Sequence, residues 1–173
     1  MKKFVSVITL VVLVGMVIAG ISRAATDTVT ATVTVLYSSI SLNRESFAYG
    51  SMNSNTASST LTLWSGAGII ATNNGGTSSF DIYGANTTGS GTGWTLAADN
   101  TGNNYIHKFC NDTVDNCTTP PTSYTALTGT PATLDASVAN TETVAFQLQI
   151  ITPTTPTDFS QQSAVVTVQA SAI

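Results

Sequence analysis

The sequence predicts an all-β protein, an antiparallel β-sandwich of about nine to twelve short strands. Three observations predict it. Apolar and polar residues alternate along most segments, which is the period of a strand with one buried face. Turn residues separate these segments at intervals of about 8 to 14 residues. No segment after residue 25 has the pattern of an amphipathic helix. A closed barrel is the alternative architecture.

The clearest alternation lies in the segment 143–152. Every second residue is apolar, namely Val144, Phe146, Leu148 and Ile150, and the residues between them are Ala145, Gln147 and Gln149. The pattern is typical of a half-buried strand. We therefore expect the valine and phenylalanine side to face the core and the glutamine side to face solvent.

The two ends of the chain after the leader carry the next clearest strands. Segment 27–35 alternates threonine with valine and alanine, and segment 163–172 places Val166, Val168 and Ala170 on one face. Because both segments are regular and terminal, we expect them to lie in the sheets and to fix the ends of the domain.

Shorter segments with the same alternation predict the remaining strands. They are 39–42, 47–49, 59–64, 69–71, 80–83, 94–96, 105–110, 124–127 and 132–134. Segment 73–76, Asn-Asn-Gly-Gly, consists of residues that tolerate positive φ. It therefore favours a reversal of the chain between the strands on either side.

The first residues have the pattern of a secretory signal peptide. Two lysines precede an apolar run from Phe4 to Ile21, and Ser22-Arg23-Ala24 follows with small residues at the two positions that a signal peptidase inspects. We expect a signal peptide over residues 1–24, cleavage before Ala25, and one domain over residues 25–173. The protein is then secreted or at the cell surface, with no membrane segment after cleavage. An uncleaved anchor is the alternative, because the apolar run approaches the length of a spanning helix.

The charge balance excludes two classes of partner. After the leader, two basic residues, Arg44 and Lys108, stand against nine acidic residues, which gives a net charge of −7. Nucleic-acid binding requires a cluster of cations along the phosphate backbone, and polybasic attraction to anionic lipid requires the same. We therefore expect neither partner.

Cys110 and Cys117 are the two cysteines of the chain. In an exported protein they predict a disulfide, and the closure of so short a loop is worth about 2.5 kcal/mol in the chain-entropy model. A free thiol pair is the alternative. The loop between them holds Asp112 and Asp115, which offer few of the six to eight oxygens that calcium requires.

No constellation of residues predicts catalysis, a cofactor or a metal. His107 is the sole histidine, and no nucleophile motif accompanies it, so neither a hydrolytic triad nor a zinc site is expected. We expect no enzyme activity, although two of the nine acids can still meet in space. Lys108 is either a solvated strand residue or one partner of an isopeptide bond assisted by Glu45 or Glu142.

Several segments together resemble the single-domain secreted surface proteins of bacteria that have an immunoglobulin-like β-sandwich. The segments are the opening Thr/Val strand, SISLNRESFAYGSM, ATNNGG followed by FDIYG, GWTLA, and the closing SAVVTVQA. The resemblance implies an immunoglobulin-like fold and a surface role. Trp94-Thr95-Leu96 is also similar to the motif of cell-wall-binding WxL domains, but their second motif is absent here, and two core residues are the alternative interpretation.

These observations lead to two functional hypotheses. The first is a non-enzymatic structural subunit of the cell surface, whose N-terminal strand pairs with an open sheet edge of another copy. The alternative is a module that binds cell-wall carbohydrate or a host ligand through exposed aromatic residues. The candidate residues for stacking on such a ligand are Trp64, Tyr83, Trp94 and Tyr105.

Overall fold

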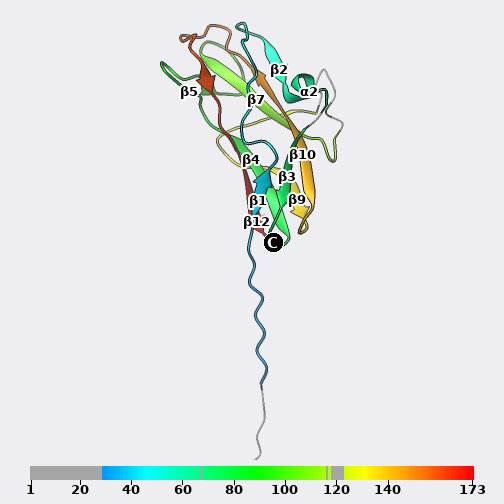
Figure 1. The fold of residues 1–173 in the computed structure, drawn as a ribbon. Helices are drawn as coiled ribbons and strands as arrows, with labels where there is room; N and C mark the ends of the chain where they lie inside the picture. The colour runs from blue at the N-terminus through cyan, green and yellow to red at the C-terminus, as the bar shows by residue number, and fades with distance from the viewer. Residues whose placement is uncertain (1–28, 67, 116, 118–122) are drawn as a thin grey trace, which may run out of the picture. The chain divides into compact units, whose positions relative to one another are not determined.

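The computed structural model describes residues 29–66, 68–115, 117 and 123–173. The predicted signal peptide lies outside these residues. Contacts within the chain divide it into two units, with the boundary between Thr34 and Val35. The described part of the first unit, residues 29–34, forms neither helix nor strand. The second unit contains every helix and strand of the described residues (Figure 1).

The second unit is a sandwich of two main sheets. The larger sheet has seven strands, and its main path is β1 (Ile40–Leu42), β3 (Ile69–Asn73), β10 (Thr143–Ile151), β7 (Asn104–Asn111) and β6 (Thr95–Leu96). Two further strands of this sheet lie off that path, β2 (Ala57–Ser59) beside β10 and β8 (Thr125–Ala126) beside β7. The smaller sheet has the order β12 (Val166–Ala172), β4 (Ser78–Gly84) and β9 (Ala132–Val138).

The remaining elements are small. β5 (Thr88–Gly89) pairs with β11 (Gln162–Ser163), and α2 (Thr60–Leu63) is a single helical turn. Neighbouring strands are antiparallel, except that β6 and β7 are parallel. Of the described residues, 41% are in strands and 3% are helical. These proportions and the two packed sheets confirm the predicted all-β sandwich.

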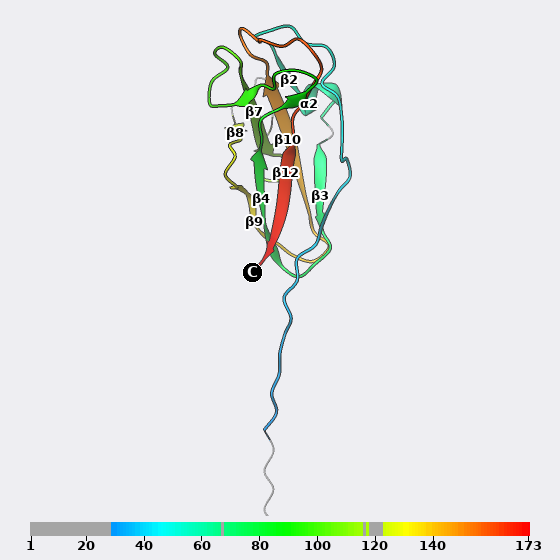
Figure 2. The same ribbon diagram turned by 90° about the vertical axis from the view of Figure 1, so that its left-hand side faces the viewer.

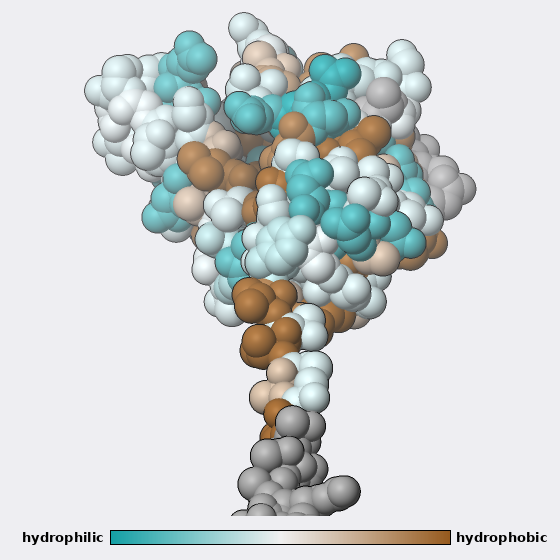
Figure 3. Space-filling view, turned by 60° about the horizontal axis from the view of Figure 1, so that its bottom comes forward, coloured by the Kyte–Doolittle hydropathy of each residue, from teal (hydrophilic) through white to brown (hydrophobic). Residues whose placement is uncertain are grey.

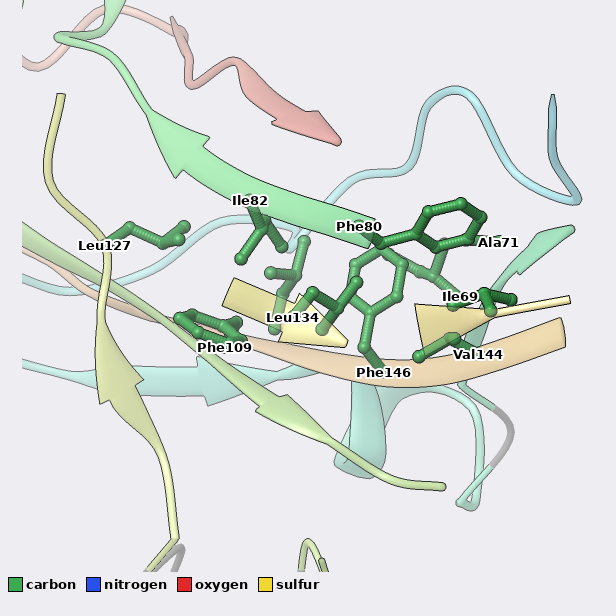
Figure 4. Packing of buried hydrophobic residues seen from close by; sticks show 11 residues of the cluster. Ile69, Ala71, Phe80, Ile82, Phe109, Leu127, Leu134, Val144 and Phe146 are labelled. Carbon is green, nitrogen blue, oxygen red and sulfur yellow. The ribbon is translucent and has the colours of Figure 1, made fainter. Parts of the chain in front are cut away.

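The hydrophobic core lies between the two main sheets. Phe80 and Ile82 of β4 point toward Val144 and Phe146 of β10, with Leu134 of β9 beside them (Figure 4). All five side chains are buried. The alternation in the sequence predicted this face of β4 and of β10, because every second residue of a strand points to the same side of its sheet.

The other face of β10 is also buried, so the expectation of a solvent-facing glutamine side is wrong. Gln147 is 0% exposed. Its Oε1 accepts a 2.6 Å hydrogen bond from Thr60 Oγ1, and its Nε2 donates to Gly66 O at 3.1 Å and to Asp112 Oδ2 at 3.0 Å. α2 and the residues after it therefore cover this face, and the hydrogen bonds replace the water that a glutamine would otherwise bind.

The predicted strand 59–64 is also wrong. β2 ends at Ser59, and α2 begins at Thr60. Ser59 caps the helical turn, because its Oγ accepts a hydrogen bond from the Thr62 N–H at 3.3 Å. A serine side chain at this position satisfies a backbone donor of the first turn and so competes with strand pairing.

The sequence favoured a hairpin at residues 73–76, but this turn joins the two sheets instead. β3 before it pairs with β1 and β10, whereas β4 after it pairs with β12 and β9. Asn73 is fully buried and fixes the crossover, because its Nδ2 donates to Gly76 O at 2.8 Å and to Val138 O at 2.7 Å. A Cβ on Gly75 would lie 2.8 Å from Tyr37 O, so glycine permits the close approach of the two backbones.

The two predicted terminal strands differ in outcome. β12 confirms the closing strand (Figure 2). The opening strand is not found, since residues 29–39 are in no strand and their side chains are exposed. Residues 47–49 likewise form no strand. In the described part of the chain, no helix has the length and apolar character needed to cross a membrane.

Candidate functional site

A groove of about 830 Å³ opens into the sandwich beside the start of β12. Residues 44–54 and residues 158–166 line it. Further into the groove lie apolar side chains of both sheets: Leu42, Ile69, Phe146, Leu148, Ile150 and Val168. The groove therefore reaches largely buried residues of the hydrophobic interior between two segments that are far apart in the sequence.

β12 has a strand partner on one side only, among the residues that the structure describes. It lies beside β4 (Figure 2). The register is regular, with Val166 opposite Gly84 and Val168 opposite Ile82. Ile82 is a fully buried core residue. Directly opposite residues share a face of the sheet, so Val166 and Val168 also face the interior, where they pack against the core and are only partly buried.

The backbone of β12 has unpaired groups beside the groove. The Ala85 N–H donates to Val165 O at 3.2 Å, whereas the N–H of Gly84 points the other way and donates to Thr128 O at 2.9 Å. Antiparallel pairing alternates between these two orientations along a strand. The N–H and C=O of Val166 and Val168 therefore point away from β4, toward the open edge.

The opposite edge of the same sheet is protected in a way that β12 is not. β9 carries Asp135, and its register against β4 shifts at two places. Bulges and charges are common devices that prevent an edge strand from pairing with another chain. β12 has no charged residue, no proline and no register shift over Val166–Ala172. It is thus the less protected edge of the smaller sheet.

Six rings pack in a series that passes along the groove. In order they are Trp64, Phe47, Tyr49, His107, Tyr105 and Trp94, with neighbouring centroids 4.9 to 6.3 Å apart. Four of them line the groove: Phe47, Tyr49, Trp94 and His107. The sequence predicted Trp94 as a candidate but missed the roles of the other three, because only the tertiary fold brings their segments together.

The four predicted stacking residues do not form one exposed surface. Tyr105 is 0% exposed and donates its hydroxyl hydrogen to Ala85 O, so its prediction as an exposed aromatic is wrong. Trp64 packs on Phe47 and beneath the guanidinium of Arg44, whose Cζ lies 4.3 Å from the ring centroid. Tyr83 lies on the outer face of β4, opposite Thr167.

Burial controls the ionisation of the residues at the centre of the ring series. His107 is buried, which lowers the pKa of its imidazole to about 4 and leaves the ring neutral at neutral pH. Its Nε2 shares a 3.0 Å hydrogen bond with the Tyr49 hydroxyl. Burial, with smaller contributions from Tyr124 and Tyr105, raises the pKa of Tyr49 well above its ordinary value. Neither ring is therefore charged at neutral pH.

The disulfide between Cys110 and Cys117 is present, as predicted, and both residues are buried. It closes the end of β7 onto the loop that holds Asp112. One carboxylate oxygen of Asp112 accepts a hydrogen bond from Gln147, so this residue stabilises the packing of β10. Nowhere in residues 29–66, 68–115, 117 and 123–173 do three or more His, Cys, Asp or Glu side chains form a group suited to a metal ion.

The suggested isopeptide bond of Lys108 requires a buried carboxylic acid, and neither candidate acid is buried. Lys108 lies on β7, opposite Gln149 of β10. Glu45 and Glu142 are both exposed, so neither is the buried acid that the reaction requires.

Comparison of the chain with protein-family models, with curated proteins and with solved structures found no match. The resemblance to immunoglobulin-like surface proteins therefore stays a prediction.

Proposed function

We propose that this chain is a secreted, non-enzymatic structural protein of the cell surface, whose copies associate through the N-terminal segment 29–35. The observation that carries the proposal is the exposure of an alternating apolar segment. Val29, Val33 and Val35 are 95%, 89% and 78% exposed. Figure 3 shows hydrophobic side chains, in brown, on this segment. An exposed alternating strand is a ready partner for an open sheet edge.

The free energies gained and lost on association predict assembly that depends on concentration. Full burial of each valine contributes roughly 1.5 to 3 kcal/mol, and each backbone hydrogen bond adds about 1 kcal/mol. Against this, association costs roughly 4 to 15 kcal/mol in lost translational and rotational freedom. The two sides are of similar size, so the loss of one valine should shift the equilibrium measurably.

A secreted location fits the disulfide between Cys110 and Cys117, since disulfides persist in oxidising compartments. A non-enzymatic role fits the chemistry of the groove. His107, its one histidine, is neutral and shares a hydrogen bond with Tyr49, and neither carboxylate of the lining, Glu45 or Asp158, is hydrogen-bonded to it.

Sedimentation velocity over a concentration series, with negative-stain microscopy of the same samples, tests the proposal. We expect purified protein to form larger species as concentration rises, and Val33→Asp to remain monomeric. Thr32→Asp is the matched control, because it places the same charge one residue away on the other face of the segment. Monodisperse monomers at the highest concentration, with residues 29–35 protected from hydrogen exchange, would contradict the proposal.

Binding of a carbohydrate or another surface ligand in the groove is a second candidate function. It is favoured by the rings of Phe47, Tyr49 and Trp94 in the lining, because aromatic faces stack on sugars. Pull-down on wall polysaccharide tests it. We expect Trp94→Ala to lose retention and Tyr83→Ala, on the outer face of β4, to keep it. Equal retention of both variants, or none by the unmodified protein, excludes the groove as the binding site.

A further inference from the structure

The groove beside β12 has three properties of a site for one more strand. It is lined by apolar side chains of both sheets, it borders backbone groups that point away from β4, and its edge strand is regular and uncharged. We infer that it accepts residues 29–35 of a second copy of this chain, paired with β12. The inference rests on the proposed association and names its acceptor.

The lengths and backbone groups of the two segments agree. β12 spans the seven residues Val166–Ala172, of which Val166 and Val168 line the groove, and the segment 29–35 also has seven residues. Strands rise about 3.3 Å per residue, so both extend roughly 23 Å. The outward N–H and C=O groups of Val166 and Val168 supply donors and acceptors for the added strand. Pairing of this kind gives affinity through the main chain and specificity through alternate side chains.

The side chains of the segment also suit the groove. When one face of the segment is turned inward, Val29, Ala31, Val33 and Val35 point toward the interior and the three threonines point outward. The inward face meets apolar residues of β10 such as Leu148 and Ile150. Segment 29–35 carries no charge, so its docking places no charge in the interior.

The residues around segment 29–35 favour a second copy as the molecule that supplies the added strand. The Gly76 N–H donates to Tyr37 O at 2.9 Å, which fixes the backbone at Tyr37 beside the end of β3. Only Leu36 separates Tyr37 from Val35, and none of these three residues is glycine, proline or asparagine. Residues of those types dominate tight turns, so nothing in this short stretch favours a chain reversal. Val29, Val33 and Val35 are exposed, so the segment is available to the groove of a second copy.

The donor segment and the acceptor groove are different surfaces of the same chain. Such a head-to-tail interface leaves a free donor at one end and a free acceptor at the other, so it produces open chains of copies unless a ring closes. It also means that the two surfaces can be inactivated separately.

Two full-length variants test the acceptor. Val33→Asp disables the donor, and Val168→Arg places a charge in the groove. Thr167→Arg is the matched control for the second, because it adds the same charge to the other face of β12. Each of the first two variants alone should sediment as a monomer, with the concentration for half-assembly raised roughly tenfold or more. An equimolar mixture should form a dimer and stop, since it contains one intact donor and one intact acceptor.

The outcomes separate this inference from the proposed function. Assembly by Val168→Arg equal to that of the unmodified protein, together with monomeric Val33→Asp, overturns the groove as acceptor and leaves the proposed function standing. So does a mixture that stays monomeric. Assembly by Val33→Asp equal to that of the unmodified protein overturns both. Val166→Pro gives a second acceptor variant if Val168→Arg unfolds, because it removes an outward N–H at the first residue of an edge strand.

A measurement on the unmodified protein completes the test and needs no folded variant. A synthetic peptide of residues 27–37, added in excess, should occupy the grooves and shorten the assemblies. A peptide with aspartate at the position of Val33 is its control. Assemblies unchanged by the first peptide overturn the inference.

Discussion

Replacement of Thr60 by valine should destabilise the domain strongly, although the two side chains have nearly the same shape. Thr60 is fully buried, its hydroxyl donates to Gln147 Oε1 at 2.6 Å, and the same hydroxyl accepts from the Leu148 N–H at 2.9 Å. Valine leaves both partners buried without that hydroxyl. An unsatisfied buried group costs roughly 1 to 3 kcal/mol, so we expect a loss of about 2 to 6 kcal/mol in the free energy of unfolding.

Urea denaturation followed by tryptophan fluorescence measures this loss, and thermal unfolding should show a Tm lower by roughly 4 to 24 °C. Thr62→Val is the control, because Thr62 lies in the same helical turn but is exposed. Its effect should stay within about 1 kcal/mol, because it removes only the hydrogen bond between the Thr62 and Ser59 hydroxyls. If Thr60→Val changes the free energy of unfolding no more than Thr62→Val does, then the hydroxyl does not hold Gln147 in the sheet.

Three further predictions concern other parts of the domain. Because burial lowers the pKa of His107 to about 4 from the ordinary 6.5, the unfolded chain binds this proton first as pH falls. The contribution of neutral His107 to the free energy of unfolding is complete above pH 6.5. It falls by about 3 kcal/mol toward pH 4, at about 1.4 kcal/mol per pH unit. His107→Leu should reduce this fall, as measured by denaturation curves at a series of pH values. Reduction of the Cys110–Cys117 disulfide should cost about 2.5 kcal/mol in the same assay, and an unchanged midpoint would contradict the chain-entropy account. Gly75→Ala should displace the backbone near Tyr37 and speed amide exchange at Gly76, whereas Gly129→Ala, with open space around its Cα, should not.

Period-two alternation predicted the strands that face the core. β4, β10 and β12 were found with their apolar faces inward, because each contributes one side to a continuous interior and nothing else competes for those residues. The disulfide was predictable because the chain has two cysteines, which leave one pairing.

The failures come from contacts between residues distant in sequence. Gln147 reads as a surface residue, and only the cover supplied by Thr60 and Gly66 makes it a buried one. Segment 59–64 alternates like a strand, but a serine cap outweighed that preference. The turn 73–76 has hairpin residues, yet the tertiary partners of Asn73 direct the chain to the other sheet.

The candidate site was the least predictable feature. The groove is a property of the space between β12 and residues 44–54, which no periodicity encodes. Of the aromatic residues singled out from the sequence, Trp94 lines the groove and Tyr105 is buried behind it. The sequence did identify segment 29–35 by its alternating valines, and the structure places this segment in no strand.

The central position of β10 also constrains the order in which the chain can fold. β10 joins β2, β3 and β7, so three strands that come earlier in the sequence meet their common partner only at residues 143–151. Such long-range pairings are slow to form, because the intervening loops must close first. A chain that emerges from a ribosome or a translocation channel N-terminus first would therefore hold these strands unpaired until its C-terminal part has also emerged. The larger sheet can be completed only late, and the open segments need protection until then.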